Sequence, residues 1–429
     1  MAATGMEAPR APERRRIAAF VAVVLAVLSA CWLVVAALAT PLLPGGAWTA
    51  LLLYTLLTIV PLAAFIATRA LGVYAGAAIR LLIFRPLWYA QFSVLLLAPL
   101  GLVAAVVGLP FGRAAAAGRA AVAAGGIVAV LLFVAGYVGS RRLEVRRLAA
   151  VFPDLPPALE GLVVAQVSDL HVGPQTSRRF LARVLEAVRR ATPDLIAVTG
   201  DLVDDFPRDV ERYAAGLGAL AAPLGVYLIP GNHEVYSGWP AVRSRLEALP
   251  ACLLVNGSAP VRRNGGRFWV AGTGDPAGAG SADVAPDIGR TLQDVPTGAF
   301  VLALAHNPAL WPALAGRGVA LTLSGHTHWG QLAFPRLGWC LASPFLQLAM
   351  GAHARGNSLL YIHPGTGYWG IPFRLGHSAQ VAIITLLRGE RAEIRDEASG
   401  QLRDAELRVV ARAQDRGGEG ASLNFRSRP

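Results

Sequence analysis

Four apolar stretches, each about 20 residues long, place the strongest constraint on how this sequence can fold. A helix of about 20 apolar residues is long enough to cross the roughly 30 Å of hydrocarbon in a bilayer. The stretches occupy residues 17–39, 48–67, 87–110 and 120–138. Residues 72–85 are predicted to form either an interfacial amphipathic helix or part of a fifth span. We therefore predict a multi-pass membrane region with about four helices in residues 1–147.

The basic charge of the chain is concentrated in this apolar region. Residues 1–150 carry 13 Arg and 3 acidic residues, whereas the rest of the chain carries 26 Arg and 24 acidic residues. A nucleic-acid-binding protein would place its basic surface on the folded soluble part, so no nucleic-acid partner is expected. Eleven Arg flank the spans on one side of the predicted bilayer, and only Arg113 and Arg119 lie on the other.

Because cytoplasmic loops are enriched in positive residues, both termini are predicted to be cytoplasmic, on a bacterial inner membrane. A rival interpretation is a cleaved twin-arginine signal that ends near Ala39. It is disfavoured because the apolar run is long for a signal and three more spans follow it. The expected partner of the region is therefore the lipid bilayer itself.

From about residue 148, short apolar runs alternate with helical stretches, which is typical of an α/β domain. The predicted strands are residues 162–167, 195–199, 226–229, 268–271, 301–305, 320–323, 359–362 and 381–386. We predict that this domain occupies residues 148–390, and that the charged residues 391–429 form a disordered tail. Three widely spaced cysteines predict neither a disulfide framework nor a thiolate metal site.

Five of the predicted strands run into polar residues that can bind a metal. These residues are Asp169, His171, Asp201, Asn232, His233, His306, His326 and His328. The carboxyl ends of strands in an open α/β sheet form the edge where ligands bind, so the eight side chains are expected at one rim. In the D-x-H and H-x-H pairs, extended backbone would place both polar side chains on the same side. Glycine before Asp201, Asn232 and His326 would allow sharp turns and a close approach to a ligand.

Carboxylate, imidazole and amide ligands together suit Mn²⁺, Fe or Zn²⁺. A magnesium site rarely uses imidazole, and a structural zinc site usually uses cysteine. Eight candidates are too many for one ion, whereas two ions about 3.5–4 Å apart that share an aspartate would use nearly all of them. The remaining histidines and two nearby carboxylates are predicted to be structural: His353, His363, His377, Asp204 and Asp205.

The motifs D-x-H, G-D-x-x-D, G-N-H-E, H-N-P and G-H-T-H follow one another in this order over about residues 160–390. In this order they resemble the calcineurin-like metallophosphoesterase superfamily. Its membrane-associated bacterial branch is the most similar, with twin-arginine-exported phosphoesterases and UDP-2,3-diacylglucosamine hydrolases. The closing stretch RGNSLLYIHPGTGYWGIPFRLG is similar to that branch as well, but the resemblance does not extend to the four spans. It implies a four-layer α/β/β/α sandwich.

The resemblance also implies a role for each motif residue. The first metal ion would be held by Asp169, His171, Asp201 and His328. Asp201 would bridge to a second ion, which Asn232, His306 and His326 would complete. His233 would be a non-ligating catalytic histidine that stabilises the transition state and protonates the leaving oxygen. Trp329 stands where these relatives often carry glycine, and it is interpreted as a substrate-binding residue.

The sequence therefore predicts a membrane-anchored dimetal phosphoesterase that cleaves a phosphodiester or pyrophosphate with a metal-bridging hydroxide. A lipid-linked substrate is expected because the domain begins a few residues after the last span. Residues 334–350 are apolar with a single charge, Arg336, and are either a buried element or a lip that contacts membrane or acyl chains. The alternative function is a multispan sensor or transporter with a non-catalytic metal-binding domain, although the spans lack the acidic residues or histidines of ion pathways.

Overall fold

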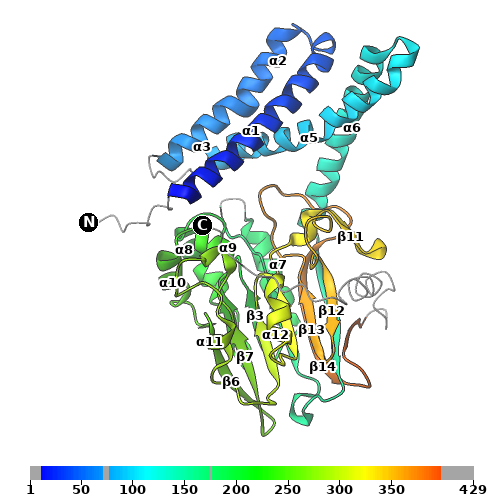
Figure 1. Ribbon diagram of the computed structural model, residues 1–429. Helices are drawn as coiled ribbons and strands as arrows, with labels where there is room; N and C mark the ends of the chain where they lie inside the picture. The colour runs from blue at the N-terminus through cyan, green and yellow to red at the C-terminus, as the bar shows by residue number, and fades with distance from the viewer. Residues whose placement is uncertain (1–10, 71–76, 174–175, 398–429) are drawn as a thin grey trace. The chain divides into compact units, whose positions relative to one another are not determined.

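The computed structural model describes residues 11–70, 77–173 and 176–397 (Figure 1). The chain divides into two compact units, Met1–Ala135 and Gly136–Pro429. Within the described residues, the first unit consists of helices joined by short turns, and the second unit contains all the strands. Each unit is described by itself.

The first unit contains the apolar stretches as helices. In chain order these are α1 (Ala11–Ala39), η1 (Thr40–Leu42), α2 (Ala47–Tyr54), η2 (Thr55–Ile59), α3 (Val60–Ala70), α4 (Ala77–Ile79), η3 (Arg80–Phe84), α5 (Arg85–Gly108), η4 (Leu109–Phe111) and most of α6 (Ala114–Arg141). Four of the resulting helical segments are long and apolar enough to cross a membrane: Ala22–Leu42, Ala47–Ala67, Arg80–Phe111 and Ala114–Arg141. The prediction of four apolar helices is confirmed.

The uncertain segment at residues 72–85 does not form a separate span in the described chain. Its second half, α4 and η3, leads directly into α5 and extends the third candidate span, while residues 71–76 lie outside the described residues. A buried amide joins three helices of this unit, because Gln91 accepts a hydrogen bond from Trp32 at 3.1 Å and donates one to Thr58 at 3.1 Å. Such hydrogen bonds stabilise helix packing where water is absent.

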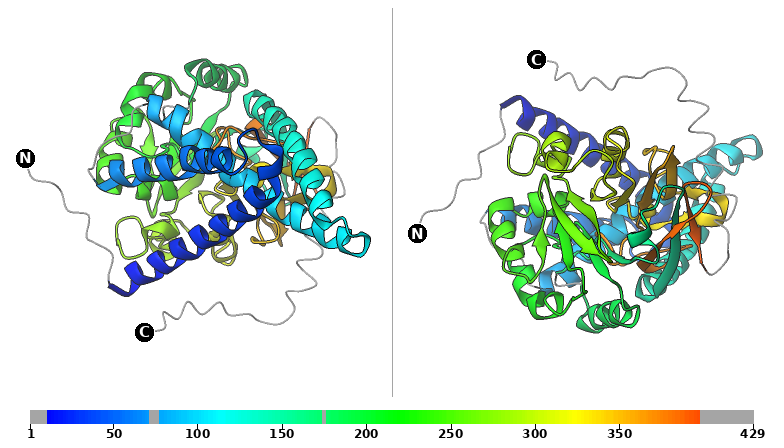
Figure 2. Two further views of the ribbon diagram at one scale, coloured as in Figure 1. Left: turned by 90° about the horizontal axis from the view of Figure 1, so that it is seen from above. Right: turned by 90° about the horizontal axis from the view of Figure 1, so that it is seen from below.

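The second unit is built on two sheets, whose strands are seen side by side in Figure 1 and nearly end-on in Figure 2. The seven-stranded sheet has the order β15 (Glu393–Asp396), β1 (Leu143–Phe152), β14 (Ala379–Arg388), β2 (Val163–Val167), β3 (Leu195–Thr199), β4 (Val226–Ile229) and β5 (Cys252–Leu253). The six-stranded sheet has the order β12 (Gly351–Arg355), β13 (Ser358–Ile362), β9 (Leu321–Ser324), β8 (Val301–Leu304), β7 (Gly266–Gly272) and β6 (Gly257–Arg263). A short hairpin pairs β10 (Ala333–Phe334) with β11 (Trp339–Cys340).

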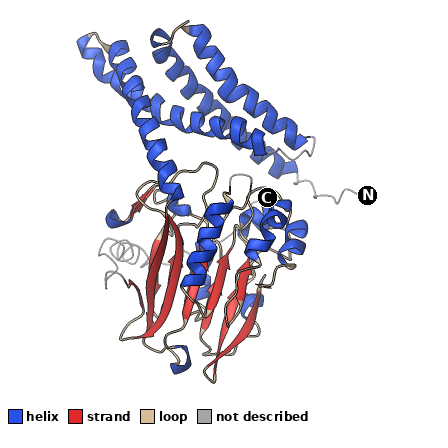
Figure 3. Ribbon diagram, turned by 180° about the vertical axis from the view of Figure 1, so that it is seen from behind, coloured by secondary structure: helices blue, strands red, loops and turns tan. Residues whose placement is uncertain are grey.

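Helices connect these strands (Figure 3). They are α7 (Arg178–Arg190), α8 (Arg208–Leu217), α9 (Asn232–Tyr236), α10 (Trp239–Leu246), α11 (Ile288–Leu292) and α12 (Trp311–Ala315), with the short turns η5 (Pro157–Leu159), η6 (Pro276–Gly278), η7 (Pro308–Leu310), η8 (His328–Gln331) and η9 (Pro335–Leu337). α7 is amphipathic: it follows the N-cap Ser177 and buries Leu181, Val184 and Val188 on one face.

The two sheets share one apolar core. It contains Val164 and Ile229 of the seven-stranded sheet together with Val270, Leu302 and Leu323 of the six-stranded sheet. A second cluster packs α7, α8 and α10 on the other face of the seven-stranded sheet, and a further one packs α11 and α12 on the other face of the six-stranded sheet. The central strands β2, β3, β8 and β9 are buried on both faces, which explains why apolar residues predominate in them, although Gln166 and Thr322 are buried polar residues within β2 and β9.

The seven-stranded sheet is wider than the sequence predicted. β1 begins two residues after α6 ends and pairs in parallel with β14 over ten residues. β15 pairs with β1 in antiparallel fashion, so the sheet includes residues that the sequence assigned to the tail. Residues 398–429, the rest of that predicted tail, lie outside the described residues.

Candidate metal centre

The structure brings all eight predicted site residues to the carboxyl ends of five strands. Asp169 and His171 follow β2, Asp201 follows β3, Asn232 and His233 begin α9 after β4, His306 follows β8, and His326 and His328 follow β9. Five of them are buried: Asp169, His171, Asp201, His306 and His328. The seven-stranded sheet supplies the carboxylates and the amide, and the six-stranded sheet supplies three imidazoles.

The backbone at these residues is not extended, contrary to the sequence-based expectation. Asp169 has φ 54° and His171 φ 45°, while His326 has φ 73° and His328 φ 48°. The strands end before these pairs, and the chain turns through the left-handed region, which is unfavourable for residues other than glycine. Such strained positions cluster at functional sites, where the surroundings hold them in place. Asp201 is another, with φ 49°.

The glycines before three site residues allow the close approach that the sequence predicted. A Cβ on Gly325 would lie 2.3 Å from Asp169 Oδ2, and one on Gly231 would lie 2.3 Å from Asp201 Oδ1. A Cβ on Gly200 would lie 2.6 Å from the ring of His306. Any larger residue at these three positions would push a site side chain away.

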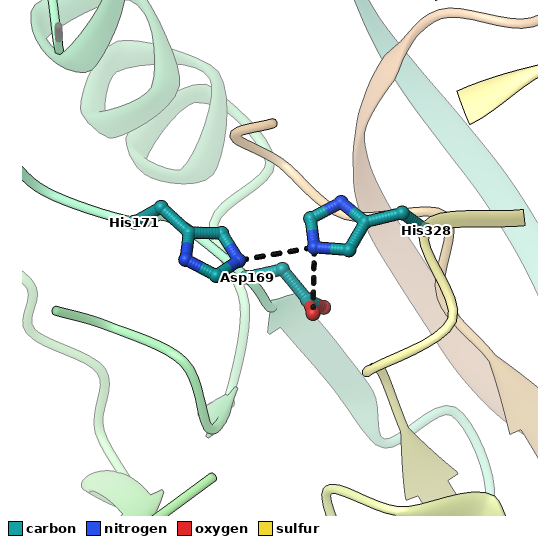
Figure 4. A group of neighbouring side chains, drawn as sticks. All are labelled: Asp169, His171 and His328. Carbon is teal, nitrogen blue, oxygen red and sulfur yellow. Dashed lines mark hydrogen bonds and ion pairs between the residues drawn. The ribbon is translucent and has the colours of Figure 1, made fainter. Parts of the chain in front are cut away.

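Asp169, His171 and His328 form a first group of converging ligand atoms (Figure 4). His171 Nε2 lies 3.0 Å from His328 Nε2, which in turn lies 3.3 Å from Asp169 Oδ1. Burial lowers the pKa of both histidines, so both rings are neutral and carry a lone pair, while burial raises the pKa of Asp169 to about 6. Among the described residues, Asp169 Oδ2 has no hydrogen-bond partner. Two neutral imidazoles and a buried carboxylate fit a divalent cation.

Asp201, His306 and His326 form a second group, which Asn232 joins. Asn232 Oδ1 lies 2.7 Å from His326 Nδ1 and 3.2 Å from His306 Nε2. The His306 Nδ1–H donates to the Thr199 carbonyl at 2.8 Å, so Nε2 faces the group. Burial lowers the pKa of His306, but the charge of Asp201 outweighs burial and raises it well above the ordinary value, so a cation bound here would take the place of the Nε2 proton. Three nitrogen and oxygen donors around one carboxylate also fit a divalent cation.

Asp201 lies between the two groups. Its Oδ2 is 3.1 Å from His306 Nε2 and 3.8 Å from His171 Nε2. Burial opposes its ionisation, but the neighbouring His306, His171 and His233 hold the pKa of Asp201 below its usual range. An ionised carboxylate that faces both groups is the expected geometry of a bridging ligand.

His233 lies beside the first group, with its ring centroid 4.5 Å from that of His171. Its backbone N–H donates to Asp201 Oδ1 at 2.9 Å, and its ring Nδ1–H donates to the Asp204 carbonyl at 2.6 Å. Burial lowers the pKa of His233, but the charge of Asp201 and the Asp204 carbonyl outweigh burial and raise it above its ordinary value. Its ring also lies close enough to His171 and Asp201 to form a third candidate ligand group.

Sequence reasoning gave no role to Glu234, the last residue of the G-N-H-E motif. Its buried carboxylate accepts three backbone N–H groups: Gly231 at 2.7 Å, Asp201 at 2.9 Å and Val203 at 2.9 Å. Burial and the charge of Asp201 raise the pKa of Glu234 to about 7. Glu234 therefore ties the turn after β3 to the turn after β4, and so positions Asp201 relative to Asn232.

Arg374 is a second residue that the sequence did not reveal. Its guanidinium is buried and donates to the carbonyls of Pro364 at 2.7 Å and Gly365 at 3.0 Å, and to that of Gly367. The loop that it holds lies directly against the first ligand group, because the Gly367 N–H donates to the Asp169 carbonyl at 2.9 Å. A Cβ on Gly365 would lie 2.9 Å from His328 Nδ1.

The residues predicted to be structural lie outside the three ligand groups. Burial lowers the pKa of all three histidines, His353, His363 and His377. The pKa of His363 is lowered to about 3. Asp204 does not cap the next helix, whose N-cap is Pro207 without a side-chain bond. It contacts the site instead, through its carbonyl and through a carboxylate oxygen 3.8 Å from His171 Nδ1.

The interpretation of Trp329 as a substrate-binding residue needs correction. The side chain is 2% exposed, packs with Cys340 and Ile362, and donates its indole N–H to the Ile362 carbonyl at 3.0 Å. The backbone at Trp329 is left-handed, with φ 51°, and this turn directs the ring into the core. Two other aromatic rings lie at the site, because Tyr236 and Trp369 have centroids 5.9 and 6.5 Å from that of His233.

Comparison with known proteins gives a consistent family. Residues 162–330 match the profile of the family described as "Calcineurin-like phosphoesterase". The chain is 30% identical over 257 residues to an "Uncharacterized metallophosphoesterase" of Helicobacter pylori strain J99, covering 60% of this chain and 67% of that protein. It is 30% identical over 264 residues to an "Uncharacterized metallophosphoesterase" of Aquifex aeolicus, covering 60% of this chain and 97% of that protein.

A third relative is named as a transmembrane protein. The chain is 32% identical over 249 residues to the "Transmembrane protein with metallophosphoesterase domain" of Danio rerio, covering 54% of each protein. The chain thus spans about half the length of this relative and about two thirds of the Helicobacter pylori protein. The profile match, residues 162–330, lies within the second unit.

Proposed function

Because this chain belongs to the calcineurin-like metallophosphoesterase family of metal-dependent phosphoester hydrolases, we propose that it is a membrane-anchored phosphoesterase with a two-metal centre. The observation that carries the proposal is the position of Asp201 between two converging ligand groups. The shared core between the sheets, with helices on their outer faces, supports the four-layer order that the family resemblance implies.

In this proposal the first ion is held by Asp169, His171, His328 and Asp201. Asp201 also reaches the second ion, whose other ligands are Asn232, His306 and His326. When bound, two such ions lower the pKa of a water towards neutrality and neutralise charge on the phosphoryl oxygens. Mn²⁺, Fe and Zn²⁺ all suit this mixed set of ligands.

His233 is the proposed proton donor to the leaving oxygen. Its raised pKa favours the protonated ring, and the Asp204 carbonyl accepts the hydrogen bond from Nδ1–H, so that Nε2–H is available for transfer. The backbone of His233 is fixed by Asp201 Oδ1, which places the donor beside the bridging carboxylate. A positioned imidazole of this kind contributes about 10²–10⁴-fold to a rate.

The proposed substrate is a lipid-linked phosphodiester or pyrophosphate. This is supported by the four candidate spans and by the single residue, Arg142, between the end of α6 and the start of β1. The excess of Arg on one side of the spans supports an inner-membrane protein with its catalytic unit in the cytoplasm. Cyclic nucleotides and phosphoproteins are weaker candidates because neither resides in the bilayer.

The test is hydrolysis by the full chain, purified in detergent and loaded with Mn²⁺, across phosphomonoesters, soluble phosphodiesters and lipid pyrophosphates. We expect turnover of at least one diester or pyrophosphate, with the lipid-linked form preferred, and loss of turnover in Asp201→Asn. Metal binding without turnover of any substrate would instead support a non-catalytic sensor. Preference for soluble phosphomonoesters would overturn the substrate class and leave the enzyme class intact.

A further inference from the structure

Most of the large apolar side chains exposed on the described catalytic unit gather in one segment. Six of the eleven in the described part of Gly136–Pro429 lie between residues 334 and 346: Phe334, Leu337, Trp339, Leu341, Phe345 and Leu346. Leu337 is 75% exposed and Phe345 81%, values that are unusual for apolar side chains of this size. The segment is therefore not the buried element that was one of its two sequence-based interpretations.

The segment is built as a hairpin with small residues inside and large ones outside. Ala333 and Cys340 pair across β10 and β11 and are fully buried in the cluster that contains Trp329 and Ile362. The neighbouring residues Phe334 and Trp339 are exposed to solvent, and their rings stack with centroids 6.2 Å apart. Because its base is fixed in the core, the hairpin holds these rings outward without further ordering, so contact with a partner costs little conformational entropy.

The exposed segment continues towards the metal centre. The Gln331 side chain makes two hydrogen bonds of 3.0 Å to the backbone of Trp369, which joins the start of the segment to the Trp369 loop. Trp369 is 53% exposed and Tyr236 67%, and both rings lie beside His233. Gln331 thus links the start of the exposed segment to the loop that carries one of these two exposed aromatic rings.

We propose that the segment Phe334–Leu346, which we call the apolar lip, inserts into the interfacial region of the lipid bilayer. The lip carries one charge, Arg336, which suits an anionic headgroup, and its aromatic side chains suit the interface. Chain connectivity indicates that the bilayer is the partner of the lip. α6 is a candidate span and one residue separates its end from β1, so a membrane-spanning α6 would keep the catalytic unit at the bilayer surface. Insertion there would present a lipid-borne phosphoester to the metal centre, a consequence that rests on the proposed function.

Fluorescence quenching on the full chain in phosphatidylglycerol-containing nanodiscs tests the lip directly. In a background with Cys31, Cys252 and Cys340 replaced, Phe345→Cys carries an environment-sensitive label, and Arg317→Cys carries the same label as a matched control. Arg317 is exposed in the turn before β9, at the opposite end of that strand. We expect the label at 345 to be quenched by doxyl lipids and protected from iodide, and the label at 317 to show the reverse.

Three results would overturn the proposal. Iodide quenching at 345 equal to that at 317 would mean that the lip lies in water. Protection from iodide without quenching by doxyl lipids would mean that protein covers it, either a second copy or another segment of this chain. A label at 345 that responds identically in detergent micelles and nanodiscs of any lipid composition would exclude a specific bilayer contact.

A second measurement separates the lip from the chemistry. The double substitution Leu337→Ser and Phe345→Ser changes two exposed side chains outside the metal centre, so folding and hydrolysis of a soluble chromogenic phosphodiester should be unchanged. We expect turnover of a lipid-linked substrate to fall at least tenfold. If both substrates are lost equally, the lip is structural; if neither substrate is hydrolysed by the unsubstituted chain, the proposed function fails while the quenching result still stands.

Discussion

Two histidines of the metal centre are oriented by backbone carbonyls. His306 donates its Nδ1–H to Thr199, and His233 donates its Nδ1–H to Asp204. In both residues the second nitrogen is left to face the site, which fixes the tautomer that chemistry there requires. Burial lowers the pKa of both histidines, but the charge of Asp201 outweighs burial and raises it above the ordinary value. The two differ in position, because only His306 belongs to one of the two principal ligand groups.

His233→Ala tests the proton-donor role. The side chain is outside the two principal ligand groups, so we expect both metals to remain, while turnover falls about 10²–10⁴-fold because no acid protonates the leaving oxygen. Metal content by elemental analysis and turnover with a soluble phosphodiester check this. A variant purified without its metals would show that His233 is a ligand, which its distance to His171 and Asp201 also permits.

His363 provides a prediction for stability against pH. Its pKa is lowered to about 3 by burial and by Arg374, while an unfolded histidine titrates near 6.5. The folded protein therefore binds fewer protons than the unfolded chain between these values, so stability is full above about pH 6.5 and falls as the pH is lowered.

In His363→Asn the amide oxygen can still accept the Gly365 N–H, but no proton is taken up. Between pH 7 and pH 5 the unsubstituted chain should lose about 2 kcal/mol more free energy of unfolding than this variant. Thermal unfolding of the full chain in detergent, at both pH values with chelator present, measures the difference. Parallel losses in the two proteins would show that His363 is already solvated in the folded state.

At the scale of elements, the loop at residues 364–367 connects Arg374 to the first ligand group. Arg374→Met keeps a long side chain but leaves the carbonyls of Pro364, Gly365 and Gly367 without their donor. Because Gly367 is bonded to Asp169, we expect the affinity for Mn²⁺ to fall about 10–100-fold, as for other residues that orient metal ligands. Isothermal titration measures it, and Arg317→Met is the matched surface control; equal affinities would exclude the positioning role.

The sequence predicted some elements well and missed others for identifiable reasons. β2, β3, β8 and β9 are buried on both faces, so the stretches that contain them are mostly apolar, and polar site residues follow each of them. β1 has an exposed, Arg-containing first half and β15 is a short polar edge strand, so neither shows such a run.

The same distinction applies within the site. The eight polar residues could be found because each follows a recognisable strand, and the structure places them together. Glu234 binds backbone groups 31 and 33 residues away, and Arg374 binds the carbonyls of a loop 7 to 10 residues before it. No local sequence pattern indicates either set of contacts. Trp329 was misinterpreted because its left-handed backbone, which turns the ring inward, has no signature in the sequence.

At the scale of the whole molecule, the two sheets contribute different halves of one ligand set. Asp169, Asp201 and Asn232 come from the seven-stranded sheet, whereas His306, His326 and His328 come from the six-stranded sheet. Metal ions held by these residues would join the two sheets at the edge of their common core. Metal binding should therefore stabilise the catalytic unit as a whole and not only the loops that hold the ligands.

Thermal unfolding of the full chain with Mn²⁺ and with chelator tests this coupling. A ligand at about 100 times its dissociation constant stabilises by about 2.7 kcal/mol, so we expect a rise of several degrees in the unfolding temperature. Asp201→Asn, which weakens both ligand groups, should lose most of that rise. A metal-induced rise that is equal in the variant would mean that the metal binds elsewhere.

The single residue between α6 and β1 has a kinetic consequence. If α6 spans the bilayer and the substrate is lipid-linked, as proposed, the enzyme meets its substrate only by lateral diffusion, so the encounters occur in two dimensions. The rate should then follow the mole fraction of substrate in the bilayer, and dilution of the whole suspension at constant lipid composition should leave turnover per enzyme unchanged. Addition of inert lipid to the bilayer should lower the rate, because it lowers the surface concentration of the substrate.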